Sequence, residues 1–460
     1  MKEKLLMWAS VLLVIASLFL YSFASWMYFQ NNKEVIAGGN SQNTEHTDDS
    51  EVIGEQESQE EGTQVEGSET IPPEETETTL PDETEKVELE NQKIRLMMIG
   101  DNLMHMSVIR SGYRSDGSRN YDFMFEPIKD YLELADIKIT NQETIFGGND
   151  LGFSGYPQFN SPTELGDAIA KAGFNVVLHA TNHTADKGIN GMQHCLSFWD
   201  QYPEVMVAGM FKEADVENQD IGLLDINGVT FAILNYTYSP NLAALPESIQ
   251  GHLGMLCNWD KETGLIDLKT IHPDVLTDIA TAKEMADVVV VCPHWGNEYT
   301  FVPSYYQELF AKQMTEAGAD LIIGTHPHVI QPVEWVVADN GNKALCYYSL
   351  GNYVSTQYDP ESMLEAMAWV TFEVKDGAVE IVEAETGAFP MVYQYDTNHT
   401  FVSVYFLEDY TEELAQAHGI HLHNDGNHTL ANLTKWAEDV LGEWIRSPKD
   451  PLKESIESAN

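Results

Sequence analysis

The feature that most constrains the fold is an alternation, from Lys93 onward, of short apolar runs with segments of helical periodicity. Val288 to Cys292 is a run of four valines and a cysteine, as is typical of a strand buried on both faces. Leu268 to Met285, just before it, has the length and pattern of a long helix. Strands and helices that alternate in this way predict an α/β fold.

The pattern changes to hairpins in the last third of this region. Val329 to Val337 and Ala344 to Leu350 flank a turn that contains Gly341, and they read as antiparallel strands. Residues beyond about 405 are mostly helical in pattern. We therefore expect one domain over residues 93–400 and a helical C-terminal appendage over residues 401–460.

The N-terminal segment, residues 1–30, differs from everything after it. Lys2 and Lys4 precede an uncharged apolar run from Leu5 to Phe29, and about 20 such residues suffice to cross a bilayer. We expect a single-pass transmembrane signal-anchor. A cleaved signal peptide ending at Ala24 is the alternative, although its apolar core is usually shorter. Because positive flanks stay in the cytoplasm, both interpretations place the remaining chain outside the cell membrane.

Residues 31–92 are rich in Glu, Thr, Ser, Gln and Gly and poor in large apolar side chains. Such a segment buries too little apolar surface to offset the entropy of ordering, so we expect a disordered acidic linker. The whole chain has a formal net charge of -49. This charge argues against nucleic acid as a partner and against binding to anionic lipid headgroups.

Polar residues of a few kinds follow five of the expected strands, at the point where each strand ends. In open α/β sheets, binding sites form beyond the carboxyl ends of the strands, so these side chains are expected to converge. Taken singly, Asp101 could be a helix cap and Asn182 a turn residue, but the repetition indicates a shared site. The residues are Asp101, Glu143, Asn182 with His183 and Asp186, His294 with Glu298, and His326 with His328.

These residue types suit a divalent transition metal. Imidazoles and carboxylates together favour zinc, manganese or iron over calcium and magnesium. The proline in His326-Pro327-His328 favours an extended backbone at His326, and positions i and i+2 of an extended chain face the same side. Glu143 could bridge two ions, and two ions about 3.5–4 Å apart can activate a water for in-line displacement. We expect one or two ions of Mn²⁺, Zn²⁺ or Fe²⁺.

The same motifs, in this order, resemble those of CapA-like poly-γ-glutamate capsule synthesis proteins. The resemblance covers roughly residues 93 to 360, and that family is similar to calcineurin-like metallophosphoesterases. It implies a four-layer αββα sandwich of the metallo-dependent phosphatase type, with two β-sheets between helical layers. The motifs are Gly100-Asp101, Asn141-Gln142-Glu143, Thr181-Asn182-His183 with Asp186, His294-Trp295-Gly296-Asn297-Glu298, Gly324-Thr325-His326-Pro327-His328 and Ser349-Leu350-Gly351-Asn352-Tyr353.

The resemblance also implies roles for individual residues. His183 would be the general acid or transition-state stabiliser near the leaving oxygen, and Asp186 and Glu298 would support the site or act as alternative ligands. The metal ligands would be Asp101, Glu143, Asn182, His294, His326 and His328.

The sequence departs from the phosphoesterase pattern after Asp101 and from the CapA-like pattern at His105. Asn102 and Leu103 follow Asp101, where phosphoesterases usually have Asp-x-His. His105 stands where CapA-like proteins often have arginine. It could be a ligand, bind an anionic substrate, or be a polar residue at a helix start. These changes weaken the case for phosphatase activity more than the case for metal binding.

Three functions remain open at this point. In the first, the protein assists the synthesis, export or processing of poly-γ-glutamate or a related anionic capsule polymer, alongside membrane-bound synthase or exporter subunits. In the second, it is a stand-alone metal-dependent phosphoesterase outside the cell. The third is a binding module without metals, which the retained histidines argue against. The chain has no G-x-x-x-x-G-K-[ST] loop, so ATP-driven polymerisation by this chain alone is not expected.

Overall fold

The computed structural model describes residues 91–214, 220–423 and 426–458, all within the unit Thr78–Asn460. The expected anchor (residues 1–30) and nearly all of the acidic linker (residues 31–92) lie outside these ranges. Within the described ranges, no helix combines the length and apolar character needed to cross a bilayer.

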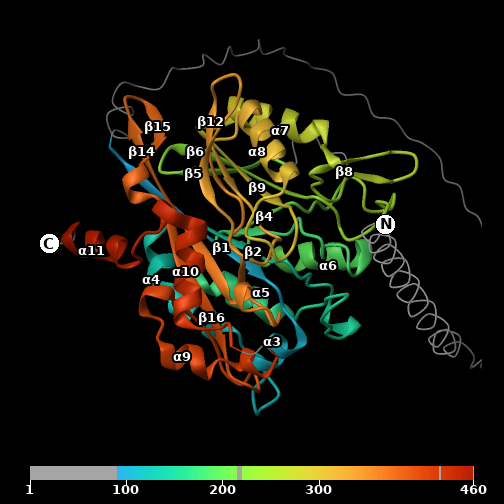
Figure 1. The fold of residues 1–460 in the computed structure, drawn as a ribbon. Coiled ribbons are helices and arrows are strands. Elements are labelled where there is room, and N and C mark those ends of the chain that lie inside the picture. Colours follow the sequence, from blue (N-terminus) through green and yellow to red (C-terminus); the bar gives the residue numbers. More distant parts are fainter. Residues whose placement is uncertain (1–90, 215–219, 424–425, 459–460) are drawn as a thin grey trace, which may run out of the picture. The chain divides into compact units, whose positions relative to one another are not determined.

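A nine-stranded mixed sheet is built around β1 (Figure 1). Its strand order is β17-β16-β14-β1-β2-β3-β4, with β13 paired to β1 and β15 paired to β14. The parallel strands are β1 (Lys93–Asn102), β2 (Ile137–Asn141), β3 (Val176–Leu178), β4 (Met206–Ala208) and β13 (Asn352–Val354). The antiparallel strands are β14 (Leu364–Lys375), β15 (Ala378–Ile381), β16 (Gly387–Tyr395) and β17 (Val402–Phe406).

A second, six-stranded sheet has the order β11-β12-β10-β9-β6-β5. Its central strands are parallel, and a hairpin forms each edge. The strands are β5 (Gly222–Ile226), β6 (Val229–Thr237), β9 (Val288–His294), β10 (Leu321–Ile323), β11 (Val333–Val337) and β12 (Lys343–Tyr347), while β7 (Cys257–Trp259) and β8 (Ile266–Ile271) form a separate pair.

The helix expected over Leu268 to Met285 begins later than predicted. Strand β8 continues to Ile271, and α7 spans Pro273–Met285. Proline suits the first turn of a helix because it lacks the N–H that would be unpaired there. The His272 side chain accepts a hydrogen bond from the backbone N–H of Asp274 and caps the helix.

Alternate residues of the strands face two different cores. On β1, Leu96 and Met98 pack between the two sheets, while Met97 faces the other way. That outer face is covered by α4 (Lys129–Leu134), α5 (Thr163–Ala172) and α6 (Gly188–Trp199). On β9, Val290 faces the inter-sheet core and Val289 faces α7 and α8 (Tyr305–Ala317). The layers are therefore helix, sheet, sheet and helix, and the expected α/β architecture with two sheets is confirmed.

The segment expected as a helical appendage begins with a strand. β17 pairs with β16, with Met391 opposite Phe406, and so extends the larger sheet beyond residue 400. The remaining helices are α3 (Met106–Ser111), α9 (Glu412–Ala417), α10 (Leu430–Leu441) and α11 (Lys449–Ser458). Short 3₁₀ turns cover Asp122–Met124, Glu126–Ile128, Asn149–Leu151, Pro360–Met363, Glu383–Glu385, Leu407–Asp409, Gly419–Leu422 and Gly442–Trp444.

One close backbone approach joins the two segments that carry Asp101 and Asn352. A Cβ at Gly100 would lie 2.0 Å from the carbonyl oxygen of Gly351, so only glycine fits there. This contact allows β13 to pair in parallel with the end of β1, with Asn352 opposite Asp101. A polar residue from late in the chain thereby reaches the carboxyl end of the first strand.

Candidate metal centre

The polar residues at the strand ends meet in one place, as predicted. Asp101 and His294 lie in the last residues of β1 and β9, while Glu143, Asn182 and the two histidines after β10 lie in the loops that follow their strands. Their ligand atoms form three overlapping groups, in each of which all atoms lie within 4.8 Å of one another. The groups are Glu143 with His294 and His326, Asp101 with Glu143 and His328, and Glu298 with His326 and His328.

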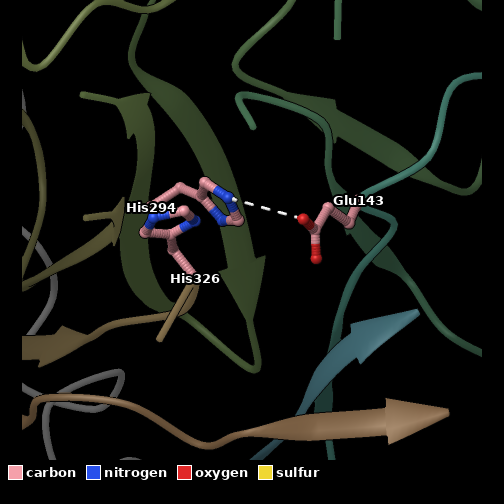
Figure 2. A group of neighbouring side chains, drawn as sticks. All are labelled: Glu143, His294 and His326. Atoms are coloured by element: carbon pink, nitrogen blue, oxygen red, sulfur yellow. Dashed lines mark ion pairs between the residues drawn. The ribbon is translucent and has the colours of Figure 1, made fainter. Parts of the chain in front are cut away.

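The first group contains Glu143, His294 and His326 (Figure 2). One carboxylate oxygen of Glu143 lies 3.9 Å from Nε2 of His294, and the side-chain oxygen of Asn182 lies 3.1 Å from the same nitrogen. The other ring nitrogen, Nδ1, contacts the hydroxyl of Thr325 at 3.0 Å. The Thr325 contact therefore orients the ring so that Nε2 faces Glu143 and Asn182.

The second group contains Asp101, Glu143 and His328. Nδ1 of His328 lies 3.1 Å from Oδ2 of Asp101 and 3.8 Å from Oε2 of Glu143. The side chain of Asn141 donates to the other oxygen of Asp101 at 2.7 Å. Glu143 is thus shared, with one oxygen directed toward each group.

The ligand atoms that have no hydrogen-bond partner are suited to binding a cation. Both oxygens of Glu143 and Nδ1 of His326 are buried and have no hydrogen-bond partner among the described residues. A buried carboxylate without partners costs several kcal/mol when it is charged. Cations coordinated between these atoms would satisfy them, and a set of imidazole and carboxylate donors suits a divalent transition metal.

The protonation of these groups in the metal-free protein follows from burial and from one another. Burial raises the pKa of Glu143 well above its usual range, and burial lowers the pKa of His294 and His326 well below theirs. Burial also lowers the pKa of His328, but the charges of Glu143 and Asp101 outweigh this effect and raise the pKa to about 9. Without metal, His328 is therefore the cation that balances the carboxylates at pH 7.

The metal-free protein is expected to lose stability as the pH rises. The folded pKa of His328 lies above its unfolded value of about 6.5. Its contribution to stability is therefore complete below about pH 6.5 and is lost as the pH rises through about 9. Ionisation of Glu143, whose pKa is raised, also lowers the stability of the folded protein as the pH rises. In excess chelator, we expect the thermal midpoint to decrease as the pH is raised from 6 to 10.

The matched control for this pH dependence is His328→Asn, which removes the titrating group and keeps a polar side chain. Its thermal midpoint should fall less over the same range. If the two proteins lose stability in parallel, general alkaline destabilisation explains the effect and His328 does not.

Beside the two groups, His183 and Asp186 form a pair. Nδ1 of His183 lies 2.8 Å from Oδ2 of Asp186, and both side chains are 7% exposed. The same Asp186 oxygen accepts the backbone N–H of Phe159 at 2.6 Å, and the Phe159 ring packs edge-on against the imidazole at 4.6 Å. The carboxylate and the ring hold the imidazole in one orientation, which suits a proton donor or acceptor.

A cleft of about 1070 Å³ opens beside the site and is lined by His183, Asp186, Glu298 and His328, among others. Glu298 lies at its edge, because its side chain is 43% exposed and one of its oxygens is 4.0 Å from Nε2 of His328. His105 also lines the cleft, and its Nδ1 accepts the backbone N–H of Thr356. His105 belongs to none of the candidate ligand groups found in the described residues.

The backbone predicted for the His326-Pro327-His328 segment was wrong. His326 and His328 have φ values of 97° and 59°, in the left-handed region, instead of an extended conformation. Their imidazoles still come near each other, with ring centroids 5.6 Å apart. Asp101 accounts for part of this geometry, because its Oδ2 accepts the His326 backbone N–H at 3.3 Å and lies close to the His328 ring.

Asn352 is a residue of the site to which the sequence analysis assigned no role. Its side-chain oxygen lies 2.9 Å from Nδ1 of His328, and its amide nitrogen donates to Gln357 at 2.7 Å. The available signal was the Ser349–Tyr353 motif, which was recognised only as part of the family pattern.

Comparison with known proteins decides the family. The family model described as "Bacterial capsule synthesis protein PGA_cap" matches residues 95–357, more than half of the chain. The chain belongs to this family. Capsule biosynthesis protein CapA of Bacillus anthracis is 30% identical over 306 residues, which are 64% of this chain and 67% of that protein.

Another relative and one solved structure are also similar to this family member. PGA biosynthesis protein CapA of Bacillus subtilis is 35% identical over 187 residues, 40% of this chain, and the matched part spans less than half of that relative, 43%. The calcineurin-like phosphoesterase YfkN of Bacillus subtilis aligns with a TM-score of 0.36 and 12% identity, over 80% of this chain and 99% of that structure. The expected resemblance to CapA-like proteins is confirmed.

Proposed function

We propose that this protein is a membrane-anchored, extracytoplasmic hydrolase that processes a capsule polymer at a centre of one or two divalent cations. The scaffold would be an αββα sandwich of the metallophosphoesterase type. The observation that carries the proposal is the position of Glu143, whose two unpaired, buried oxygens face two histidine-containing groups. Membership of the capsule synthesis family supports the polymer as the substrate.

Each residue of the site would have a defined task. Asp101, Asn182 and His294 would hold cations together with Glu143, His326 and His328, and Mn²⁺, Zn²⁺ or Fe²⁺ would suit these donors. A cation bound there polarises a substrate oxygen and lowers the pKa of a water. His183 would deliver a proton from Nε2 to the leaving oxygen, while Asp186 holds the ring through Nδ1. Glu298, at the cleft edge, would position substrate or act as an additional ligand beside His326 and His328.

A stand-alone phosphoesterase is the second candidate, and it would use the same His183–Asp186 pair, which supports ester hydrolysis without partner subunits. In the first candidate, membrane-bound synthase or exporter subunits would supply poly-γ-glutamate or a related polymer. The two candidates share the same metal centre and differ in the source of the substrate.

The proposal is tested on the purified full chain and in the producing strain. Metal content is measured by mass spectrometry, and hydrolysis of an aryl phosphate and an aryl ester is followed with added Mn²⁺. Surface polymer is compared in a deletion strain complemented with wild type or with His183→Asn. Bound metal with polymer altered only in the His183→Asn strain supports capsule processing. Aryl phosphate turnover with unchanged polymer favours the stand-alone enzyme, and a metal-free protein contradicts both.

The proposed anchor predicts a particular N-terminus. If residues 1–30 remain attached as a membrane span, the protein should stay in the membrane fraction after an alkaline wash. Its intact mass should then include those residues. A protein that begins near Ser25 and is released from membranes would establish the cleaved signal peptide instead. A variant that lacks residues 5–29 serves as the control, because it should remain inside the cell.

A further inference from the structure

The cleft beside the metal centre lacks the charges that a polyanion needs. None of the described residues that line it is a lysine or an arginine, whereas Asp186, Glu298 and Asp359 contribute carboxylates. Two bound divalent ions would bring four positive charges against five carboxylates, since the buried Asp101 and Glu143 lie next to His328, which lines the cleft. Away from the metal centre, a chain with one negative charge per unit would meet carboxylates without counter-cations.

The edge of the cleft carries exposed aromatic rings. Tyr156, Tyr299 and Tyr358 all line it and are 77%, 49% and 51% exposed. Elsewhere in the described residues, only Tyr113, Tyr305 and Phe401 are aromatic side chains of similar exposure. Half of the exposed large aromatic rings therefore surround this one cleft. A tyrosine offers an apolar face with a polar tip, which matches the alternating C–H faces and hydroxyl groups of a sugar ring.

The polar groups of the cleft fit a ligand that both donates and accepts hydrogen bonds. Glu298 and Asp359 only accept when ionised, and Gln158 and Asn241 both donate and accept. The backbone N–H of Thr356 donates to Nδ1 of His105, so the neutral imidazole carries its proton on Nε2 and donates. Hydroxyl groups satisfy all of these partners. The ionised carboxylate groups of a polyglutamate carry no proton, so they could not donate a hydrogen bond to the acceptors Glu298 and Asp359.

We propose that this cleft binds a neutral, hydroxyl-rich glycan chain that has at most one anionic group, placed at the metal centre. The proposal rests on the proposed function and narrows its substrate: the segment of the capsule polymer that reaches the site is a glycan, and a run of γ-linked glutamates does not enter the cleft. A glycan stacks on the tyrosines at the edge and donates hydroxyl protons to Glu298 and Asp359, while the rest of the capsule polymer stays outside the cleft.

The test compares two classes of oligomer on the Mn²⁺-loaded full chain by titration calorimetry at low salt. The neutral probes are hexamers of β-1,4-linked glucose, of N-acetylglucosamine and of α-1,4-linked glucose; the anionic probe is a γ-linked glutamate hexamer. At least one neutral hexamer should bind tenfold or more tightly than the anionic one. If the γ-glutamate hexamer binds as tightly as every neutral probe or more tightly, the proposal is wrong.

Variants separate stacking from charge. Tyr156→Ala should weaken binding of the preferred neutral hexamer at least tenfold, whereas Tyr113→Ala, an exposed tyrosine outside the cleft, should leave it unchanged. Asp359→Lys should tighten γ-glutamate binding several-fold at low salt, and high salt should remove this gain. Equal losses in both tyrosine variants would contradict stacking in the cleft.

The same protein sample distinguishes this inference from the proposed function. A preparation that holds metal and hydrolyses an aryl ester but prefers the anionic hexamer overturns only the glycan assignment. A preparation that binds a neutral hexamer but holds no metal overturns only the hydrolase assignment.

Discussion

A Glu143→Gln variant is expected to lose most of its bound metal and to reverse the effect of a chelator on stability. Wild-type protein should hold one or two ions per chain, and the variant should hold less than a tenth of that. In saturating Mn²⁺ or Zn²⁺, the variant should be less stable than wild type. In excess chelator it should be more stable, by about 1–3 kcal/mol.

The reversal follows from the surroundings of the two Glu143 oxygens. They are buried and have no hydrogen-bond partner in the described residues, so in metal-free protein only the charge of His328 opposes the larger cost of desolvating the carboxylate. An amide removes the ionisable group. With metal present, the wild type gains about 2.7 kcal/mol when the free ion is at 100 times its Kd, and the variant forgoes this gain. Metal content by mass spectrometry and unfolding by denaturant measure the two effects.

Glu365→Gln is the matched control. Glu365 is also fully buried, both its oxygens also lack partners in the described residues, and burial raises its pKa as well. It belongs to none of the candidate ligand groups there. Glu365→Gln should therefore keep its metal and show no reversal between metal and chelator. A reversal in both variants, or in neither, would show that Glu143 does not coordinate a cation.

A His183→Asn variant is expected to retain its metal and to lose hydrolytic activity by 10²- to 10⁴-fold, the range for removal of a general acid. His183 lies beside Asn182, which we propose as a ligand, but belongs to none of the candidate ligand groups of the described chain. Its Nδ1 is held by Asp186, which leaves Nε2 for the substrate. Asp186→Asn should lose less, about tenfold, because the imidazole remains and only its orientation is relaxed.

His194→Asn is the control for the substitution itself. His194 is exposed, contacts the carbonyl oxygen of Phe146 through Nδ1, and does not line the cleft. Its activity and metal content should equal those of wild type. Turnover of an aryl ester and metal content are measured on the same samples. Parallel loss of metal and activity in His183→Asn would make His183 a ligand, and unchanged activity would remove it from the mechanism.

The apolar pattern was sufficient to predict which strands are buried and where their polar ends lie. Val288 to Val291 alternate between two cores, as a strand covered on both faces requires. Because parallel strands end at one edge of a sheet, Asp101 and Glu143, which lie at or just after the ends of the neighbouring strands β1 and β2, could be placed near each other without coordinates. The start of α7 was missed, since Ile266–Ile271 pairs with the strand just before it, Cys257–Trp259, and such pairing overrides local helical pattern.

What the sequence alone determined is the α/β class, the capsule-family pattern and the chemical kinds of side chain at the strand ends, because these depend on local periodicity and on residue identity. Only the tertiary structure decided how the candidate ligands are distributed among the metal-binding groups. It placed Glu143 between two groups, turned His326 and His328 through left-handed backbone, and brought in Asn352 across the Gly100–Gly351 contact. These features depend on contacts between residues that are far apart along the chain, and no local pattern encodes such distances.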